Sequence, residues 1–342
     1  MGIFSKFIDS YEIKDGVCTV ALNKRGKLDR ERVKKIFDIQ EVKECKEIVV
    51  KIGDKVRYIG ERAFEKCTSL KTIEIPATVT KIGRLAFYNC ISLSRIEVEK
   101  QNTAYRSING DLYSKDGTIL LQYAVGKDEK SFTVPKCVTN IGGNAFSSNT
   151  SLNRITIPDS VTSINYYAFN GCENLVSIDV DENNEEYQSV DGVLYTKDGK
   201  YLVRYPEGKN EATFVVPEGI EKICSCAFHF CKNLESIGIP EGATEIFDWV
   251  FFRCTNLTSI TLPESLWKVG SGTFECCTAL ESIVLPAYIK TMGEDVFAGC
   301  TNLKIYSKDV FEPDEWVDWN PEKCPVVWSY EPKEHVGKRT ND

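Results

Sequence analysis

Cysteine and histidine are the residue types in this chain whose spacing could support metal chemistry. Cys224, Cys226 and Cys231 lie around His229, and thiolate and imidazole ligands at such short spacings are typical of zinc sites. Cys231, however, belongs to a column of residues that recurs along the chain. The other members of this cysteine column are Cys67, Cys90, Cys172, Cys254, Cys277 and Cys300, with Asn149 in one place. A small, weakly polar side chain packed at a recurring corner explains the column, so we expect no metal and no other cofactor.

The number of cysteines could also indicate disulfides. The chain has 14 cysteines, but disulfide frameworks are typical of short secreted chains that cannot bury a core, and this chain has 342 residues. Stacked coils of a repeat would hold equivalent Cβ atoms roughly 4.8 Å apart, whereas the mean in a disulfide is about 3.8 Å. We therefore predict that most cysteines of the column are buried free thiols.

Catalysis would need a nucleophile beside a base, and the chain has only two histidines, His229 and His335. Residues such as Ser147, Asn170 and Glu275 occupy the position of His229 in other repeats, which predicts an ordinary surface position. His335 lies in a polar tail and has no motif around it. The sequence contains no Gly-rich phosphate loop and no calcium-loop spacing. We predict that the chain is not an enzyme.

Charge and hydropathy exclude further classes of partner. The net charge of -8 and the pI near 5.2 oppose binding to nucleic acid or to an anionic membrane, which would need clustered Lys and Arg. No window approaches the roughly 20 apolar residues of a membrane span. The first residues lack the apolar region of a signal peptide, and Lys6 breaks the myristoylation pattern. By sequence alone, the expected location is the cytoplasm.

A 23-residue repeat organises most of the chain. Its unit reads Ile-Gly-x-x-Ala-Phe-x-x-Cys-x-x-Leu-x-x-Ile-x-Ile-Pro-x-x-Val, as in residues 59–79. Equivalent units begin at Ile59, Ile82, Ile141, Ile164, Ile223, Ile246, Val269 and Met292. Two of the intervals are 59 residues long and so contain insertions of 36 residues, at 99–134 and 181–216, which match each other at an offset of 82. Alternating apolar residues around Asp116-Gly117 and Asp198-Gly199 predict that each insertion is a β-hairpin excursion from the solenoid.

Within one unit, Ile73 and Ile75 alternate with Thr72 and Glu74, which predicts a short strand whose isoleucines face inward. Proline then ends the strand, because it has no N–H to donate. The recurring prolines are Pro76, Pro135, Pro158, Pro217, Pro240, Pro263 and Pro286. Stacked units would pair strand on strand and share one continuous core.

Both ends of the chain depart from the repeat. Residues 44–58 resemble a degenerate first coil, and the charged segment 27–42 has helical spacing. The last part lacks the repeat and contains Trp316, Trp319 and Trp328. We predict an N-terminal cap at 1–47, a solenoid at 48–305, and a C-terminal cap and tail at 306–342, because an open coil would expose its core and a free strand edge.

The repeat unit resembles that of the BspA-like leucine-rich repeat family over roughly residues 48–305. The resemblance implies an α/β repeat: a curved leucine-rich-repeat solenoid with a parallel concave sheet, β-hairpin insertions and terminal caps. It also implies a bacterial surface protein that binds host or microbial proteins. The family's Gly after the first Ile is Asn165, Cys224 and Phe247 in three copies, so this position cannot require a positive φ throughout.

The outward positions of the predicted strands form the candidate binding face, because solenoids commonly bind partners through their concave side. These positions are Thr72, Glu74, Arg95, Glu97, Arg154, Thr156, Ser177, Asp179, Ser236, Ser259, Thr261 and Ser282. The first half is charged and the second half is small, and small residues would let the main chain of a partner approach closely. The alternative is that these positions are simply solvated.

Six tyrosines of the insertions form a second candidate surface, since tyrosine is enriched at interfaces. They are Tyr105, Tyr113, Tyr123, Tyr187, Tyr195 and Tyr205. The alternative is that they pack the hairpins onto the coils, and alternation with apolar neighbours favours this packing for Tyr113 and Tyr195.

Two functions are compatible with these patterns. The first is a monomeric, non-catalytic interaction or adhesion module at the cell surface that binds a protein or a glycan through the concave face. The second is an intracellular structural or assembly scaffold, which the missing export signal and the many thiols favour.

Overall fold

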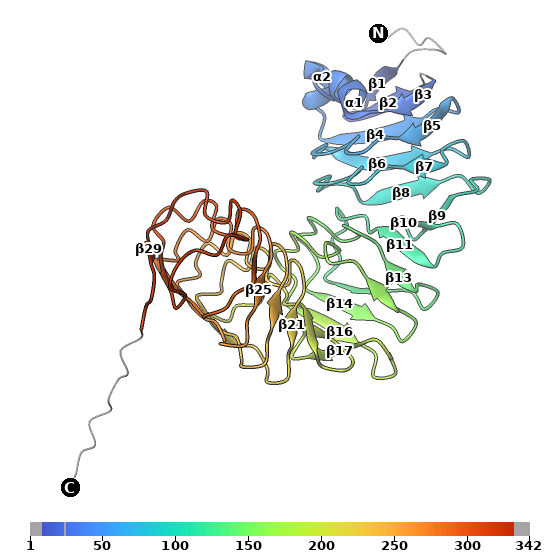
Figure 1. Cartoon of the computed structure of the whole chain (residues 1–342). Helices are drawn as coiled ribbons and strands as arrows, with labels where there is room; N and C mark the ends of the chain where they lie inside the picture. The colour runs from blue at the N-terminus through green and yellow to red at the C-terminus, as the bar shows by residue number, and fades with distance from the viewer. Residues whose placement is uncertain (1–8, 24, 332–342) are drawn as a thin grey trace. The chain divides into compact units, whose positions relative to one another are not determined.

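The computed structural model of the chain describes residues 9–23 and 25–331. Its strands form a β-solenoid of about 12 turns with parallel sheets (Figure 1). The chain divides into two compact units, Met1–Lys209 and Asn210–Asp342.

In the first unit, a typical coil contributes one long strand and one short strand, and equivalent strands of successive coils pair side by side. The long strands form the sheets β1-β2-β4-β6-β8 and β12-β14-β16. Their bounds are β1 Ser10–Lys14, β2 Val17–Leu22, β4 Glu47–Ile52, β6 Leu70–Ile75, β8 Arg95–Val98, β12 Ser131–Thr133, β14 Arg154–Ile157 and β16 Ser177–Val180. The remaining strands are β3 Gly26–Leu28, β5 Val56–Ile59, β7 Lys81–Ile82, β9 Tyr105–Ile108, β10 Asp111–Ser114, β11 Ile119–Gln122, β13 Asn140–Ile141, β15 Ser163–Ile164, β17 Tyr187–Val190, β18 Val193–Thr196 and β19 Tyr201–Arg204.

The long strands alternate as predicted, with every second side chain in the core. Ile73 pairs in parallel register with Ile96, and Ile155 pairs with Ile178. All four side chains are fully buried. A one-residue shift would turn each of these side chains to the outside, so the apolar pattern fixes the register of the stack.

Turns, not helices, lead from each short strand to the next long strand. The structure describes all of residues 48–305 and contains no helix there. The expected α/β repeat is therefore corrected to a β repeat. Arg62 and Lys66 show the reason, because their left-handed backbone (φ of 53° and 62°) cannot continue a right-handed helix. The N–H groups of the turn bond the next coil instead, as from Phe64 N to Ala86 O at 2.8 Å.

Each insertion is part of the solenoid, although we expected an excursion from it. β10 and β11 pair antiparallel across Asp116-Gly117, which confirms the predicted hairpin. A further turn, Asn109-Gly110, joins β9 to β10, and both of its residues have the positive φ (52° and 84°) of a type I′ turn. β11 then pairs in parallel with β13, so the insertion supplies the short strand of an additional coil. Strands β17, β18 and β19 repeat the antiparallel arrangement.

The tip of each inserted hairpin covers the edge of the long strand that precedes it. Ile96 N–H donates to Gly110 O at 2.8 Å, and Val98 N–H donates to Ser107 Oγ at 2.9 Å. In the second insertion, Ile178 N–H donates to the carbonyl of the equivalent tip glycine at 2.9 Å. The long-strand sheet therefore stops at β8, and again at β16 within the first unit.

Two short helices precede the repeats. Helix α1 (Arg30–Phe37) lies in the segment with helical spacing, and α2 (Gln40–Lys43) follows it. The Asp29 side chain accepts the Arg32 N–H at 3.0 Å and so caps α1. Strands β1 and β2 were not predicted; they pair antiparallel, and β2 continues in parallel onto β4.

The second unit consists of regular coils. Its long strands are β20 Thr213–Val215, β22 Ser236–Gly238, β24 Ser259–Thr261, β26 Ser282–Leu285, β28 Lys304–Ser307 and β29 Val326–Val327. Its short strands are β21 Lys222–Ile223, β23 Glu245–Ile246, β25 Lys268–Val269 and β27 Thr291–Met292, and they pair in parallel in this order. Trp319 lies edge-on to Phe297 with 5.8 Å between ring centroids, and Trp316 is also buried.

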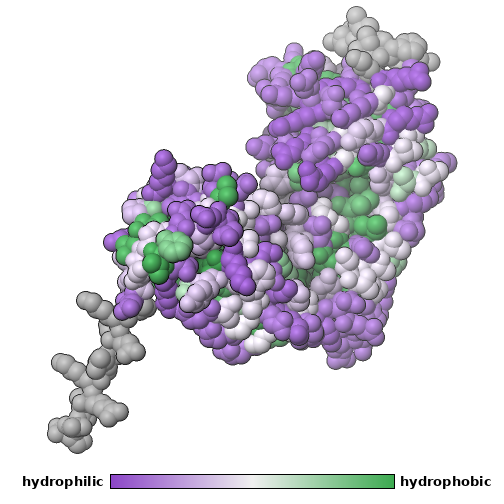
Figure 2. Space-filling model, viewed as in Figure 1, coloured by the Kyte–Doolittle hydropathy of each residue, from purple (hydrophilic) through white to green (hydrophobic). Residues whose placement is uncertain are grey.

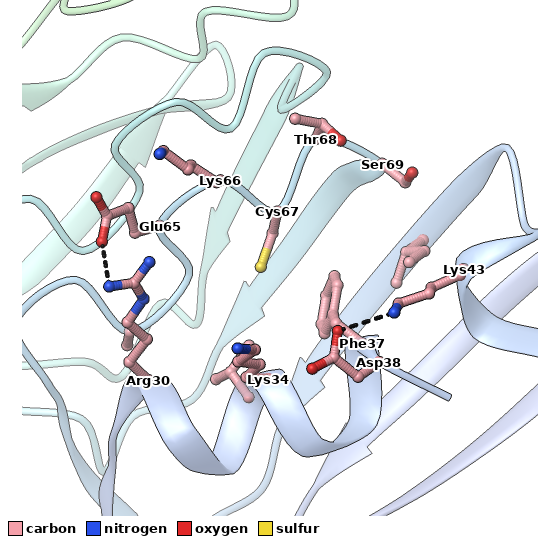
Figure 3. A pocket seen from close by; sticks show the side chains of 13 residues that line it. Arg30, Lys34, Phe37, Asp38, Lys43, Glu65, Lys66, Cys67, Thr68 and Ser69 are labelled. Carbon is pink, nitrogen blue, oxygen red and sulfur yellow. Dashed lines mark ion pairs between the residues drawn. The ribbon is translucent and has the colours of Figure 1, made fainter. Parts of the chain in front are cut away.

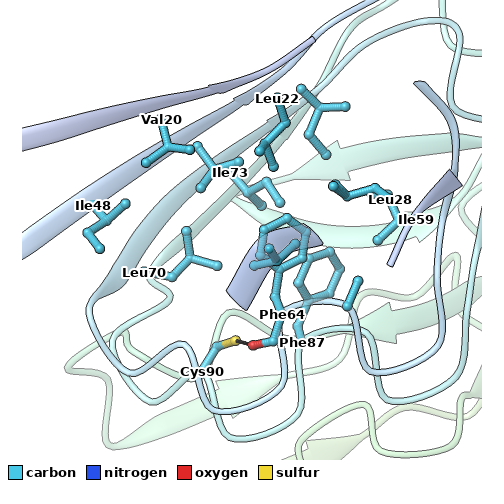
Figure 4. Close-up of a cluster of buried hydrophobic side chains, with 14 of the residues drawn as sticks. Val20, Leu22, Leu28, Ile48, Ile59, Phe64, Leu70, Ile73, Phe87 and Cys90 are labelled. Atoms are coloured by element: carbon cyan, nitrogen blue, oxygen red, sulfur yellow. Dashed lines mark hydrogen bonds between the residues drawn. The ribbon is translucent and has the colours of Figure 1, made fainter. Parts of the chain in front are cut away.

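Phenylalanines and cysteines fill the core as two columns. Phe64 stacks on Phe87 at 5.8 Å between centroids, and the thiol of Cys90 donates to Phe64 O at 3.0 Å (Figure 4). The same bond joins Cys172 to Phe146, Cys254 to Phe228, Cys277 to Phe251 and Cys300 to Phe274 at 3.0 to 3.2 Å. The column therefore needs a side chain that is both small and a donor. Burial of the column is confirmed except at Cys67, which is half-buried.

Asn149 shows that donation, rather than sulfur itself, is what this position requires. Its Nδ2 donates to Val125 O at 3.3 Å, while its Oδ1 accepts the N–H groups of Ser151 and Leu152 at 3.0 and 2.7 Å. The amide thus satisfies three main-chain groups at the one coil where the cysteine is missing.

Candidate functional site

The predicted outward columns are aligned by the strand register in both units. Thr72 pairs with Arg95 and Glu74 pairs with Glu97. In β14 and β16, Arg154 pairs with Ser177 and Thr156 with Asp179. In the second unit, Ser236 pairs with Ser259 and Gly238 pairs with Thr261. Equivalent side chains therefore stand in rows across neighbouring strands.

None of the twelve predicted binding residues is buried. The exposed ones are Arg95, Arg154, Ser259, Thr261 and Ser282, and the half-buried ones are Thr72, Glu74, Glu97, Thr156, Ser177, Asp179 and Ser236. Their orientation is as predicted, and their role in binding stays a prediction.

In the first unit, the charges of this face pair with one another. Lys51 Nζ lies 3.3 Å from Glu74, and Arg95 and Arg154 form ion pairs with Glu97 and Asp179. Figure 2 shows hydrophilic side chains over β4 and β6. Exposed ion pairs contribute at most about 1 kcal/mol, but a partner would have to separate them or bind above them.

In the second unit, the face is small and almost uncharged. Val215 of β20 is 69% exposed, and it pairs in register with Gly238 of β22. A Cβ placed on Gly238 would meet only Val215, at 4.0 Å. The main chain of β22 is therefore accessible beside an exposed apolar side chain. Alignment on Pro217 could have placed Val215 in this outward column, but the sequence analysis missed it.

Aromatic side chains border this face at its C-terminal side. Val284 pairs with Tyr306, whose ring lies 4.6 Å from that of Tyr330. Lys304 places its ammonium group 5.1 Å from the Tyr306 ring centroid. The face thus combines small residues, an exposed valine and an aromatic border.

The cysteines and the histidine that could suggest zinc are buried or half-buried. Cys224 and Cys226 are buried, and burial raises the pKa of Cys224 to about 12. His229 is half-buried and stacks on Phe252, which holds the same position in the next coil, at 4.9 Å between centroids. Within 9–23 and 25–331, no three His, Cys, Asp or Glu side chains are grouped as a metal site would need. His335 lies outside the described residues.

The tyrosines of the insertions pack rather than form a surface. Tyr113 and Tyr195 are buried, which confirms the packing alternative for them, and so are Tyr123 and Tyr205. Tyr105 is half-buried, and its phenol oxygen accepts the Ile82 N–H at 2.9 Å. Tyr187 makes the same bond to the N–H of the equivalent isoleucine at 3.1 Å.

A hollow of about 340 Å³ lies between α1 and the first coil (Figure 3). Its carboxylates are paired, Glu65 with Arg30 at 2.9 Å and Asp38 with Lys43 at 3.1 Å. The Cys67 sulfur points into it, but burial raises the pKa of this thiol to about 12. The thiol is therefore protonated at neutral pH and is a poor nucleophile.

Two ion pairs with buried carboxylates were also missed by sequence reasoning. Arg204 donates to Glu207 at 2.5 Å, and Lys127 donates to Asp111 at 2.8 Å. The pairs occupy different positions of the two insertions, so matching the copies residue by residue would have singled them out. Neither pair lies on the outward strand face.

Comparison with known proteins supports an interaction module. Across the described ranges, no helix is both long and apolar enough for a membrane crossing. No curated protein matches the chain. The solved structures that match include a leucine-rich repeat protein from Eubacterium ventriosum, with 25% identity, a TM-score of 0.60 and coverage of 94% of this chain and 82% of that one.

Two further structures show the same fold. The pneumococcal vaccine antigen PcpA has 18% identity and a TM-score of 0.57, with 98% of this chain and 89% of that chain covered. A leucine-rich cell surface protein from Faecalibacterium prausnitzii has 22% identity and a TM-score of 0.53, with 97% and 95% covered. The sequence profile of the BspA-type leucine-rich repeat region matches six copies, at residues 40–114, 125–190 and 207–309. Repeats of this kind are generally non-catalytic protein-interaction modules, and the chain belongs to the BspA-type leucine-rich repeat family.

Proposed function

We propose that the chain is a non-catalytic module that binds a protein partner through the outward face of β20, β22, β24 and β26 in the second unit. The observation that carries the proposal is the pairing of Val215, 69% exposed, with Gly238, which has no side chain. Val215 is the last residue of β20, the first strand of the sheet β20-β22-β24, and burying its exposed side chain contributes roughly 1.5–3 kcal/mol.

The serine rows extend this face without adding charge. Ser236, Ser259 and Ser282 occupy equivalent outward positions of β22, β24 and β26. A protein partner can approach their main chain closely and pack apolar side chains on Val215. The paired charges of the first unit offer a partner less, because their attraction is already satisfied within the sheet.

Two of the similar structures are named as a cell surface protein and a vaccine antigen, which favours a cell-surface location over an internal scaffold. Surface labelling of intact cells, with a known internal protein as the reference, distinguishes the two. Labelling no stronger than that of the internal protein would contradict the surface location.

The binding proposal is tested by placing large side chains on the outward face of β22, β24 and β26. The combined Ser236→Arg, Ser259→Arg and Ser282→Arg variant should fold, since surface substitutions cost within about 0.5 kcal/mol each. We expect its affinity for a partner captured on the parent chain to fall more than tenfold, or about 1.4 kcal/mol.

The matched control places the same three arginines outside the strands, at Asn256, Thr278 and Thr301, which are exposed and uncharged. Ser147, which the sequence analysis expected at the surface, is buried. An arginine at that position would disturb packing, so Ser147 is not used as a control. If both triple variants bind the partner as the parent does, this face is not the binding site.

A further inference from the structure

A ladder of main-chain hydrogen bonds joins the turn of each regular coil to the turn of the next. Arg62, Phe64 and Lys66 donate their N–H groups to Arg84, Ala86 and Tyr88 at 3.1, 2.8 and 2.9 Å. In the second unit, the N–H groups at the same three positions of each turn also donate to the next turn. They belong to Cys226, Phe228 and Phe230, to Trp249, Phe251 and Arg253, and to Gly272, Phe274 and Cys276. One turn thus presents alternate donors on one side, and its neighbour presents alternate carbonyls.

One turn of this ladder is missing in the first insertion. Leu120 pairs with Ile141, and Tyr123 N–H donates to Ala145 O at 2.8 Å, so these residues occupy the places of the repeat isoleucine and phenylalanine. Only two residues separate Leu120 from Tyr123, whereas four separate Ile141 from Phe146. The additional coil therefore has its short strand and its core aromatic residue, but no turn.

The missing turn leaves main-chain groups open on both sides. Within the described residues, the N–H groups of Leu85, Phe87 and Asn89 have no hydrogen-bond partner, and neither have the carbonyls of Gly143 and Ser147. Four of these five residues line one cavity of about 170 Å³, Asn89 being the exception. The cavity is a slot with donors from one coil and acceptors from another.

The second insertion shows how side chains fill part of such an opening. There, Glu207 accepts the Gly171 N–H at 2.8 Å, and Arg204 donates to Phe169 O at 3.2 Å. The residues 82 positions earlier are Val125 and Gln122. Val125 cannot accept a hydrogen bond through its side chain.

Gln122 lines the slot, but its amide donates to Tyr123 O at 2.9 Å and to Ala145 O at 3.5 Å, so the Gly143 and Ser147 carbonyls stay open. The second insertion thus satisfies one donor of its open turn, the Gly171 N–H, with its own side chain, whereas the counterpart in the first insertion, the Asn89 N–H, stays open. Apolar side chains of Phe87, Leu112 and Leu121 line the open slot.

We propose that this slot binds a short main-chain segment of a partner protein, which takes the place of the missing turn. Its carbonyls accept from Leu85 and Phe87, its N–H groups donate to Gly143 and Ser147, and an apolar side chain packs on Leu121. An inorganic anion or a metal ion would satisfy only one wall, whereas a polypeptide carries alternating donors and acceptors. The site is separate from the strand face of the second unit.

The probe is a synthetic peptide that copies the turn at residues 83–89, acetylated and amidated at its ends. In the free chain, the amide hydrogens of Leu85 and Phe87 should exchange at least tenfold faster than those of Arg62 and Phe64, measured residue by residue by NMR. Adding the peptide should slow exchange at Leu85 and Phe87 and leave Arg62 unchanged.

Two variants test the location. Asn144→Arg places a long side chain in the slot; Arg62 holds the same turn position with the same left-handed backbone (φ of 53° against 65° at Asn144). We expect peptide affinity to fall at least tenfold in Asn144→Arg and to be unchanged in Asn256→Arg, an exposed site outside the slot. The double variant Gln122→Arg, Val125→Glu copies the filler of the second insertion and should also abolish binding.

Slow exchange at Leu85 and Phe87 in the free chain, no protection with millimolar peptide, or full binding by Asn144→Arg would each overturn the proposal. The triple serine-to-arginine variant of the second unit should bind the peptide normally. Failure of the strand-face proposal and failure of the slot proposal are therefore separate results.

Discussion

Replacing Ile178 by Asp tests the inward column at its most constrained position. Ile178 is fully buried and pairs in register with Ile155, and its N–H donates to Gly192 O at 2.9 Å. Its carbonyl accepts the Ser189 hydroxyl at 2.6 Å. The side chain thus lies where the last long strand of its sheet meets the hairpin tip, and no water is available to a charge placed there.

The expected loss is close to the whole stability of an ordinary domain. Truncating a buried isoleucine costs roughly 2–5 kcal/mol. The new carboxyl must either stay ionised without a partner or take up a proton, and each pKa unit of such a shift costs about 1.4 kcal/mol. A shift of about three units brings the total to roughly 6–9 kcal/mol, against typical stabilities of about 5–15 kcal/mol.

Urea denaturation followed by circular dichroism measures this loss. Ile178→Ala should lose the truncation term alone, and Val176→Asp, at a 42% exposed neighbour, should lose less than about 1 kcal/mol. Burial raises the pKa of the carboxyl that Ile178→Asp introduces, so this variant should be least destabilised at low pH and should weaken as pH rises. If the urea midpoint of Ile178→Asp equals that of Val176→Asp, or if the stability of Ile178→Asp does not change with pH, the placement of Ile178 in the inward column is refuted.

Two further predictions concern buried ionisable groups. Burial holds the pKa of the Cys277 thiol well above its ordinary value. A thiol reagent should therefore label native protein first at exposed Cys137, and the buried cysteine column should react only on unfolding. Fast labelling of native protein at most cysteines, or few free thiols after denaturation without reductant, would contradict this prediction. Burial also raises the pKa of Glu207 to about 7 despite the Arg204 guanidinium, so the stability it contributes is complete below about pH 4.5 and is lost as pH rises through 7. Glu207→Gln should remove this dependence while exposed Glu218→Gln keeps it, and identical pH profiles for parent and Glu207→Gln would show the assignment to be mistaken.

The sequence predicted the long strands because their evidence is local and repeated. Ile73 and Ile75 alternate with polar neighbours, proline ends the strand, and the pattern recurs in phase, so register and core followed together. The cysteine column was predictable for the same reason. Its hydrogen bond to the preceding phenylalanine carbonyl was not, because that bond joins adjacent coils and depends on their spacing.

The outer side of the coils was mispredicted because its stabilisation is not local. Arg62 and Lys66 adopt a left-handed backbone although they are not glycines, and their residue types do not predict this conformation. Hydrogen bonds to the next coil compensate for that strain, and a single unit does not contain them. In the insertions, Asp116-Gly117 gave the correct hairpin, whereas the turn at Asn109-Gly110 carries an equally strong signal and was overlooked.

The sequence predicted which residues of the candidate site point outward in rows. It did not predict which of them form ion pairs or which apolar side chain is exposed among them. Alternation identified Ser236 and Arg154 as outward, yet the pairing of Arg154 with Asp179 and the exposure of Val215 depend on strand register across coils. The open slot was out of reach for a different reason. It is defined by main-chain groups that lack partners, which residue types do not encode.

The insertions break the periodicity of the stack. A uniform array would satisfy every turn donor and every strand edge except at its ends. In the first insertion, the hairpin tip satisfies the edge of β8 through Gly110 and Ser107, while the absent turn leaves Leu85 and Phe87 without acceptors. The second insertion adds Arg204 and Glu207 and so restores part of that turn. Two copies of one insertion therefore differ at this opening, since Glu207 bonds the Gly171 N–H in the second copy and no group bonds the equivalent Asn89 N–H in the first. The first copy is where a partner's main chain has hydrogen bonds to complete.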